Sequence, residues 1–335
     1  MNILKLIKDQ IDEATKLDES LIGLNSVFTH IKRAESLLNL AQAQEDDQYF
    51  TDVIYRTNHS YEGILKESFR VLTGKNEDRK TPYQIEKHLL EHELLNERVI
   101  ELLTNYREKW RNPSTHDHNL FFTYDEAFLA IMSISSFVHV FMTQILEKVY
   151  YKKEKTAVKN ELSKIQKGIE NDYKNFALKD KVKTILQAFG KRNITKTDEE
   201  VRRSRFETEI IGSLTAYIEA LDKNIKIDVE PIIKSGNRQL RPDLILEEKK
   251  KKVLIEVKIN RRDRRGFMNE RIFEDQLLSY LIHTNIKTGI LFIVPSEMKE
   301  DDEYELTEKI LEVSGNKIEL LTLQLSRKNA PQQRI

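Results

Sequence analysis

Apolar residues in the first 150 positions of the chain recur at the spacing of an α-helix. Along residues 50–72, for example, apolar and small side chains fall on one stripe. Helices are predicted at about 3–24, 27–44, 47–73, 82–91, 93–110 and 124–150. Gly74, Pro82 and the pair Asn112-Pro113 should separate them, because glycine and proline interrupt helices. The N-terminal part is therefore predicted to be an all-α helix bundle.

The pattern changes after about residue 150. Residues 150–168 are rich in lysine and poor in large apolar side chains, which is typical of an exposed helix between domains. Residues 172–190 return to helical spacing, so we expect this segment to pack against the second domain. A helix at about 199–222 follows. Beyond it we predict strands at 226–233, 241–248, 251–259, 289–294 and 318–325, with helices at about 268–284 and 302–313.

This order of a helix, three strands, a helix and a strand is typical of an α/β sandwich. A chain of 335 residues also fits two domains of ordinary size. We therefore predict a helical domain at 1–151, a helical linker at 152–198 and an α/β domain at 199–335.

Composition limits the chemistry that the chain can carry. Lysine and arginine together number 55, as do aspartate and glutamate, so any basic surface for a polyanion must be local. The chain has no cysteine, which leaves oxygen or imidazole ligands for any metal. The first residues do not resemble a signal peptide, and no uncharged stretch is expected to reach membrane-spanning length. We expect a cytoplasmic protein without a membrane partner.

Three ionisable residues are predicted to converge in the α/β domain. Glu256 and Lys258 lie two residues apart on one predicted strand, so their side chains project from the same face. Asp243 begins the preceding strand, and the short connection at 247–252 makes the two strands antiparallel neighbours. Asp243 should then lie opposite the strand end that carries Glu256 and Lys258.

This combination of groups suits phosphodiester hydrolysis. One or two carboxylates can hold Mg²⁺ or Mn²⁺ while water and a substrate phosphate complete the shell, and a nearby ammonium can stabilise developing charge. The alternative is that Glu256 and Lys258 form a solvated pair with no function. The strand around them is almost entirely apolar, as in the centre of a sheet, which favours a functional site.

The sequences RPD at 241–243 and IEVK at 255–258 resemble the PD-(D/E)xK motif of restriction-endonuclease-like nucleases. The resemblance covers the C-terminal domain and implies a restriction-endonuclease-like α/β sandwich. It also implies an acidic residue on the first helix, for which Glu207 is favoured over Glu209 because Glu207 shares the apolar stripe. Gln276 matches the glutamine on the helix after the motif, whose implied role is to support the lysine or contact nucleic acid. A plain exposed residue is the alternative for Gln276.

Basic residues flank this motif. Lysines cluster at 248–252, and the run at 260–266 contains Arg261, Arg262, Arg264 and Arg265. Beside a cleft, such groups would neutralise backbone phosphates without reading the base sequence. Taken alone, either run is typical of a solvated turn.

The helical domain carries a second candidate, the sequence RNPSTH at 111–116. Arg111 and His116 should lie on a tight connection, where histidine can transfer protons and arginine can bind phosphate. The motif and its helical context resemble the Rx4–6H motif of HEPN ribonucleases. That resemblance implies RNA cleavage without a metal, in a homodimer whose subunits share one cleft, with Asn112 as a polar neighbour. The alternatives are a non-cleaving RNA-binding or dimerising domain and a simple capping turn.

These expectations combine into one hypothesis. The chain is predicted to be a nuclease that hydrolyses DNA with a cation held by Glu207, Asp243 and Glu256, while Lys258 assists the attacking water. Analogy with fusions of the two families suggests prokaryotic defence against phage or other foreign nucleic acid. The rival hypothesis makes the helical domain a ribonuclease toxin and the α/β domain a nucleic-acid-binding module. A non-catalytic dimer that binds nucleic acid is the third possibility.

Overall fold

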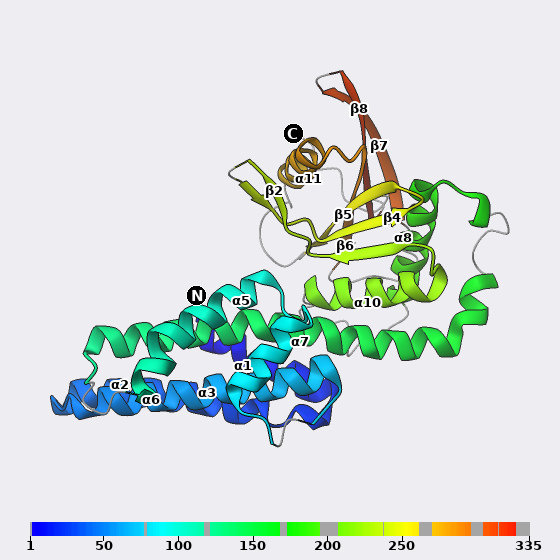
Figure 1. The fold of residues 1–335 in the computed structure, drawn as a ribbon. Helices are drawn as coiled ribbons and strands as arrows, with labels where there is room; N and C mark the ends of the chain where they lie inside the picture. Colours follow the sequence, from blue (N-terminus) through cyan, green and yellow to red (C-terminus); the bar gives the residue numbers. More distant parts are fainter. Residues whose placement is uncertain are drawn as a thin grey trace, which may run out of the picture. The chain divides into compact units, whose positions relative to one another are not determined.

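The computed structural model of the chain consists of two compact units, Met1–Tyr150 and Tyr151–Ile335 (Figure 1). The structure describes residues 2–76, 79–116, 121–167, 173–194, 207–236, 238–260, 270–295, 304–313 and 315–325. Helices make up the first unit, and a mixed sheet with helices makes up the second. This agrees with the predicted combination of an all-α part followed by an α/β part.

Local sequence features explain where several helices of the first unit begin and end. They are α1 (Ile3–Leu17), α2 (Leu24–Gln44), α3 (Gln48–Thr73), α4 (Pro82–Glu91), α5 (Glu97–Tyr106), α6 (Asn112–His116) and the first part of α7 (Tyr124–Lys167), with the short helix η1 (Glu19–Leu21). The Asn2 side chain caps α1, and Thr81 with Gln84 forms a capping box on α4. Gly74 ends α3 with a φ of 69°, a conformation that glycine adopts without strain.

A wide helical turn joins α5 to α6. In η2 (Arg107–Arg111) the N–H of Asn112 donates to the carbonyl oxygen of Arg107, five residues earlier, as in a π-helix. Pro113 accounts for this turn, because proline has no N–H and its ring would clash with the carbonyl four residues earlier in an α-helix. The prediction that Asn112-Pro113 ends the helix is therefore wrong. Arg111 and His116 lie on helical backbone instead of a tight connection.

The helix α7 contains the most apolar segment of the first unit. Residues 127–146 contain no Asp, Glu, Lys or Arg, so the expectation about uncharged stretches is wrong. An 18-residue window of this helix has a mean hydropathy of 1.7, and 56% of the window is buried. Its buried side chains, such as Phe137 and Phe141, belong to the core of the helical unit. The bundle core therefore accounts for the apolar length of α7.

A six-stranded mixed sheet forms the centre of the second unit (Figure 1). Its strands are β1 (Lys226–Val229), β4 (Leu244–Glu248), β5 (Lys251–Asn260), β6 (Thr288–Pro295), β7 (Tyr304–Val313) and β8 (Asn316–Leu325), in the spatial order β1-β4-β5-β6-β8-β7. The pairs β5–β6 and β6–β8 are parallel, and the other pairs are antiparallel. The strands β2 (Ile233–Ser235) and β3 (Arg238–Leu240) form a separate small sheet.

Helices cover both faces of the large sheet (Figure 1). They are α8 (Leu178–Ile194), α10 (Glu207–Leu221) and α11 (Glu270–Thr284), with the short helix η3 (Tyr173–Asn175). Apolar residues of α8 and α10 share one core with Ile255 and Phe292, whereas Leu277 of α11 shares another with Leu254. Because neighbours along a strand point to opposite faces, β5 contributes to both cores. Its nearly continuous apolar sequence follows from this double burial.

Residues 152–198 do not form a separate linker throughout. Val158, Val182 and Phe189 lie in the same core as the sheet. Lys152 and Lys153, which made the segment resemble a solvated connection, are exposed on α7. The segment therefore includes amphipathic helices, with one solvent-exposed side and one side buried in the domain core.

The helix predicted near 302–313 is in fact the strand β7, which pairs with β8 along its whole length. Charged residues four apart, such as Glu305 and Lys309, also occur as ion pairs on solvated helices, so they do not distinguish a helix from this strand. In the structure β7 is an edge strand, where charged side chains are common because they discourage further pairing. The signal that favoured a strand is the alternation of half-buried Tyr304 and Leu306 with exposed neighbours.

Candidate active site

The register of β4 and β5 brings Asp243 beside Glu256. Leu244 pairs with Ile255 in this antiparallel ladder, so the next facing positions are Asp243 and Glu256. A tight turn at residues 249–250, both with positive φ, closes the hairpin and fixes this register. The predicted neighbourhood of the two carboxylates is therefore present in the structure.

The Lys258 ammonium is the point where the charged side chains meet. Its Nζ lies 2.9 Å from Glu256 Oε1, 3.1 Å from Glu207 Oε1 and 3.6 Å from Asp243 Oδ2. It also donates to the carbonyl oxygen of Val257 at 2.9 Å. Asp243 Oδ2 in turn accepts a hydrogen bond from the Val257 N–H at 2.7 Å, so the backbone of β5 holds this carboxylate. Of the two candidates on α10, Glu207 is the one that contacts Lys258.

The helix α11 contributes further side chains to this cluster. Gln276 Nε2 donates to Glu256 Oε1 at 3.0 Å and to the hydroxyl oxygen of Tyr280 at 2.8 Å. The ring centre of Phe273 lies 5.8 Å from Lys258 Nζ. Gln276 is thus a direct contact of the carboxylate cluster. The sequence analysis missed Phe273, although its spacing of three residues from Gln276 puts the two on one helix face.

Burial dominates the electrostatics of the two central carboxyls. The side chain of Glu256 is 2% exposed and that of Asp243 is 15% exposed. Burial, and after it the charge of Glu256, raises the pKa of Asp243 to about 8, against an ordinary value of 3.8. Burial likewise raises the pKa of Glu256. Both carboxyls therefore hold a proton at higher pH than a solvated carboxyl does.

Lys258 stays charged among these groups. Burial acts to lower its pKa, but the charges of Asp243 and Glu256 outweigh burial and raise it. One ammonium faces three carboxylates, so the fully ionised cluster has a net charge of −2. Glu256 Oε2 is buried and has no hydrogen-bond partner among the described residues. The cluster therefore has fewer positive charges and donors than its carboxylates can use.

The donors of this cluster fit a divalent cation in kind. Within the described ranges, no three carboxylate or histidine groups surround a common point as metal ligands. The three carboxylates of this cluster approach the Lys258 ammonium. Mg²⁺, however, is commonly held by only one or two carboxylates, with water and phosphate completing its shell. Asp243 and Glu256 supply such a pair, and the unpartnered Oε2 of Glu256 is a free ligand atom. The residues therefore suit a cation with few protein ligands.

The two basic runs differ in their relation to this cluster. Lys249 and Lys250 form the turn between β4 and β5, at the opposite end of β5 from Lys258. The strand from Lys251 to Lys258 spans roughly 23 Å at about 3.3 Å per residue. The lysine run therefore does not border the carboxylates, which agrees with the alternative of a solvated turn. The run with Arg261, Arg262, Arg264 and Arg265 lies outside the described residues.

Buried hydrogen bonds hold the motif of the helical unit. The Asn58 amide on α3 donates to the Ser114 hydroxyl at 2.8 Å, and its carbonyl oxygen accepts from Tyr106 at 3.0 Å. Arg111 Nη1 donates to Asn112 Oδ1 at 3.2 Å. Buried Asn58 thus links α3 to both helices that flank the π-helical turn. Sequence analysis missed Asn58, although a polar residue beside the apolar stripe of α3 is a signal for such a bond.

The described residues include the side chain of only one member of the predicted pair of Arg111 and His116. His116 ends α6, and its side chain lies outside the described part of the structure. Arg111 Nη2 lies 3.9 Å from a carboxylate oxygen of Glu62. Arg111 thus has a carboxylate neighbour on α3, and its pairing with His116 stays a prediction.

Comparisons with known proteins add no relative. No protein-family model, no curated protein and no solved structure matches the chain. The function must therefore be inferred from the residues and their geometry.

Proposed function

We propose that the second unit is a metal-dependent nuclease that hydrolyses phosphodiester bonds in DNA. One observation carries this proposal: two carboxyls with raised pKa values, half-buried Asp243 and buried Glu256, share the Lys258 ammonium at the ends of adjacent strands. The PD-(D/E)xK resemblance and the order α10, β1, β4, β5, α11, β6 support a restriction-endonuclease-like fold. Cytoplasmic defence against foreign nucleic acid is the setting that we propose for this activity.

Each residue has a separate role in this proposal. Asp243 and Glu256 would hold Mg²⁺ or Mn²⁺, which lowers the pKa of bound water and offsets the phosphate charge, and Glu207 would become a third ligand by turning from its contact with Lys258. Lys258 is protonated at neutral pH, so it acts by orienting water and stabilising developing charge instead of accepting a proton. Gln276 holds the Glu256 carboxylate through its amide group.

A plasmid-nicking assay tests this proposal. The wild type should cut supercoiled plasmid in Mg²⁺ and not in EDTA. Asp243→Ala and Lys258→Ala should abolish cutting, because each removes a group at the centre of the cluster. Lys226→Ala is a matched control, since Lys226 is an exposed lysine on the edge strand β1. Full activity in either central variant would contradict the assignment.

A second candidate function belongs to the helical unit. The buried bonds of Asn58 to Ser114 and Tyr106 position the segment that carries Arg111 more firmly than a plain connection requires. We therefore keep a metal-independent ribonuclease at Arg111 and His116 as the alternative, with Asn112 beside them. RNA would then be cut in EDTA to give cyclic phosphate ends, and His116→Ala but not Lys258→Ala would remove the activity. A wild type that cuts neither DNA nor RNA would instead be a non-catalytic binding dimer.

We also propose that the helical unit forms a homodimer. Tyr124, Phe128 and Met132 lie one turn apart on α7 and are 36%, 44% and 40% exposed, and Leu129 beside them is 52% exposed. An exposed apolar stripe of this kind is typical of an interaction surface. Light scattering should show a dimer for the wild type and a monomer for the double variant Phe128→Glu, Met132→Glu. An unchanged mass in that variant would place the interface elsewhere.

A further inference from the structure

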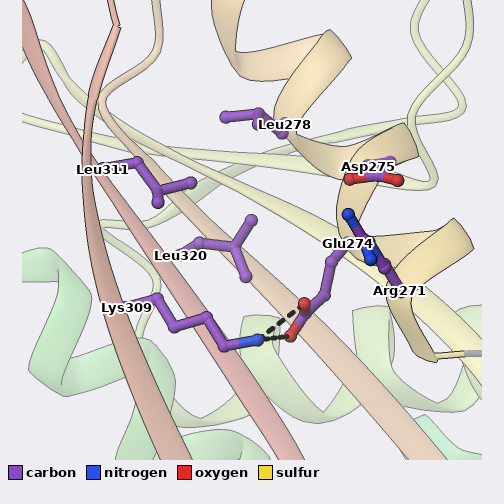
Figure 2. Close-up of a pocket in the computed structure, with 7 residues that line it drawn as sticks. All are labelled: Arg271, Glu274, Asp275, Leu278, Lys309, Leu311 and Leu320. Atoms are coloured by element: carbon purple, nitrogen blue, oxygen red, sulfur yellow. Dashed lines mark hydrogen bonds and ion pairs between the residues drawn. The ribbon is translucent and has the colours of Figure 1, made fainter.

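A cavity of about 380 Å³ lies between α11 and the β7–β8 hairpin (Figure 2). Its lining residues are Arg271, Glu274, Asp275 and Leu278 of α11, Lys309 and Leu311 of β7, and Leu320 of β8. The helix α11 contacts β5 at the candidate active site through Gln276, and it contacts β7 and β8 through Glu274. The cavity is therefore next to the candidate active site but separated from it by α11.

Most of the cavity wall is apolar or already neutralised. The three leucines form an apolar surface, and Leu320 is buried. Lys309 Nζ lies 2.8 Å and 2.7 Å from the two carboxylate oxygens of Glu274 (Figure 2), and Thr322 donates to Glu274 Oε1 at 3.2 Å. This ion pair leaves little net charge for a ligand to meet. A ligand with a large apolar surface is therefore favoured over a compact ion.

Two polar groups of the wall remain available. Arg271 and Asp275 are four residues apart on α11, so they lie one helical turn apart at the mouth of the cavity. Both are exposed, and within the described part of the chain no ion pair engages either of them. The guanidinium can only donate hydrogen bonds, and the carboxylate accepts them. A complementary ligand thus presents an acceptor and a donor near each other.

We propose that this cavity binds one nucleotide through its base. A base has an apolar flat face for the leucines and an edge that combines donors with acceptors. Asp275 accepts from an exocyclic amine of the base, and Arg271 donates to a neighbouring carbonyl oxygen or ring nitrogen. The volume lies within the range of small-molecule sites, roughly 300–1,000 Å³. The nucleotide is either an unpaired position of a nucleic-acid strand or a free mononucleotide, and only the first source rests on the proposed nuclease function.

Saturation-transfer NMR on the full chain in EDTA tests the binding without any cleavage. The probes are the deoxymononucleotides of guanine, adenine, cytosine and thymine, with deoxyribose phosphate as a baseless probe. We expect transfer to base protons, strongest for the three bases with an exocyclic amine. Absence of transfer, or equal binding of the baseless probe, would overturn the proposal.

Variants of the lining make the test specific to this cavity. Leu278→Trp fills the space and should remove binding, while Arg271→Ala and Asp275→Ala, on the exposed helix surface, should each weaken it about tenfold. Lys226→Ala should leave binding unchanged, since Lys226 lies on the edge strand β1. Wild-type affinity in both Arg271→Ala and Asp275→Ala would exclude this cavity as the binding place.

Two further measurements separate this inference from the proposed nuclease activity. Lys258→Ala should lose plasmid cutting and keep nucleotide binding, because Lys258 does not line the cavity. A DNA hairpin with one unpaired base should displace a bound mononucleotide if the natural ligand is part of a strand. A mononucleotide that no hairpin displaces would identify a free nucleotide as the ligand instead. Both results require the same contacts with Arg271 and Asp275.

Discussion

Two clusters of the same composition lie at opposite ends of the β4–β5 hairpin, and they differ in how their charges are matched. In each cluster one lysine contacts an aspartate and a glutamate; all three are buried in the second cluster, whereas Lys258 and Asp243 of the first are half-buried. The first consists of Asp243, Glu256 and Lys258, and the second of Asp222, Glu248 and Lys181. Residue type alone therefore does not distinguish a site from a structural ion pair.

Every charge in the second cluster is satisfied by its neighbours. Lys181 Nζ lies 2.6 Å from Glu248 Oε1 and 3.1 Å from Asp222 Oδ2. Asp222 also accepts from the Tyr173 hydroxyl at 3.3 Å and from the N–H of Asn224 at 3.0 Å. Although burial opposes the charged form, the Asn224 N–H and Lys181 lower the pKa of Asp222. Lys181 and Asp222 are thus each held in the charged form by their neighbours, as in a structural ion pair.

The first cluster differs in each of these respects. A third carboxylate, Glu207, approaches the single ammonium, and one oxygen of Glu256 has no partner among the described residues. Burial raises the pKa values of Asp243 and Glu256 instead of leaving them ionised. Unmatched buried charge is costly in a structural element and useful where a cation or phosphate binds.

Lys258→Met has the largest expected effect, and the effect is on activity. Methionine keeps the length of the side chain but removes the ammonium, and loss of one such charge-stabilising group lowers kcat by about 10²–10³-fold. The fold should survive, because Asp243 and Glu256 can take up protons in place of the ammonium. Plasmid nicking and urea denaturation on the same preparation measure both effects. Unchanged nicking would remove Lys258 from the mechanism.

Lys181→Met should have the opposite outcome. Removing one partner of a buried ion pair leaves uncompensated charge, which lowers the free energy of unfolding by about 3–5 kcal/mol. In this variant the Asn224 N–H still favours the charged form of Asp222, which then lies buried without its lysine. Urea denaturation measures the loss, and the fraction that remains folded should nick plasmid at the rate of the wild type. A loss below about 1 kcal/mol would mean that the second cluster contributes no more than the first to the free energy of unfolding.

The sequence was sufficient to locate the first cluster because strand periodicity and a short turn determine which side chains meet. The spacing of Glu256 and Lys258 put both on one face, and the turn at 249–250 set Asp243 beside them. The apolar stripe of α10 likewise indicated Glu207. These are local patterns, so they can be recognised without the rest of the fold.

The second cluster was not predictable from the same kind of pattern. Lys181, Asp222 and Glu248 come from three separate elements, and only the packing of α8 on the sheet brings them together. The strand β7 was mistaken for a helix for a related reason, since its pairing with β8 is a tertiary contact that overrides local preference. The sequence left open whether the lysine turn at 249–250 borders the site, and the hairpin puts it at the opposite end of β5 from Lys258.

Asp243→Asn and Asp222→Asn should change the pH dependence of stability in opposite directions. With a pKa near 8, folded Asp243 keeps a proton that the unfolded chain releases above about pH 4, so this group lowers stability as pH rises from about 4 to 8. Asparagine cannot ionise, so Asp243→Asn gains stability relative to the wild type across that window. Urea denaturation in EDTA at stepped pH measures the difference. Parallel curves would mean that Asp243 titrates as a solvated carboxyl.

The control variant Asp222→Asn has the reverse sign. The lowered pKa of Asp222 stabilises the folded state above the ordinary value of 3.8, and this stabilisation is lost as pH falls through the lower folded value. Asp222→Asn should therefore be less stable than the wild type at neutral pH, and the difference should shrink in acid. A difference that grows in acid would contradict the ion pair with Lys181.

Removal of one tyrosine hydroxyl beside each cluster should give the smallest effects. It should also distinguish a catalytic role of the first cluster from a structural role of the second. Tyr280→Phe removes the acceptor for Gln276, so the amide that holds Glu256 becomes less fixed, and nicking should slow by about two- to tenfold with little change in stability. Tyr173→Phe removes a donor to Asp222 and should cost about 1 kcal/mol of stability without slowing the folded enzyme. If Tyr280→Phe loses stability and keeps its nicking rate, Gln276 and Tyr280 support the fold and not the reaction.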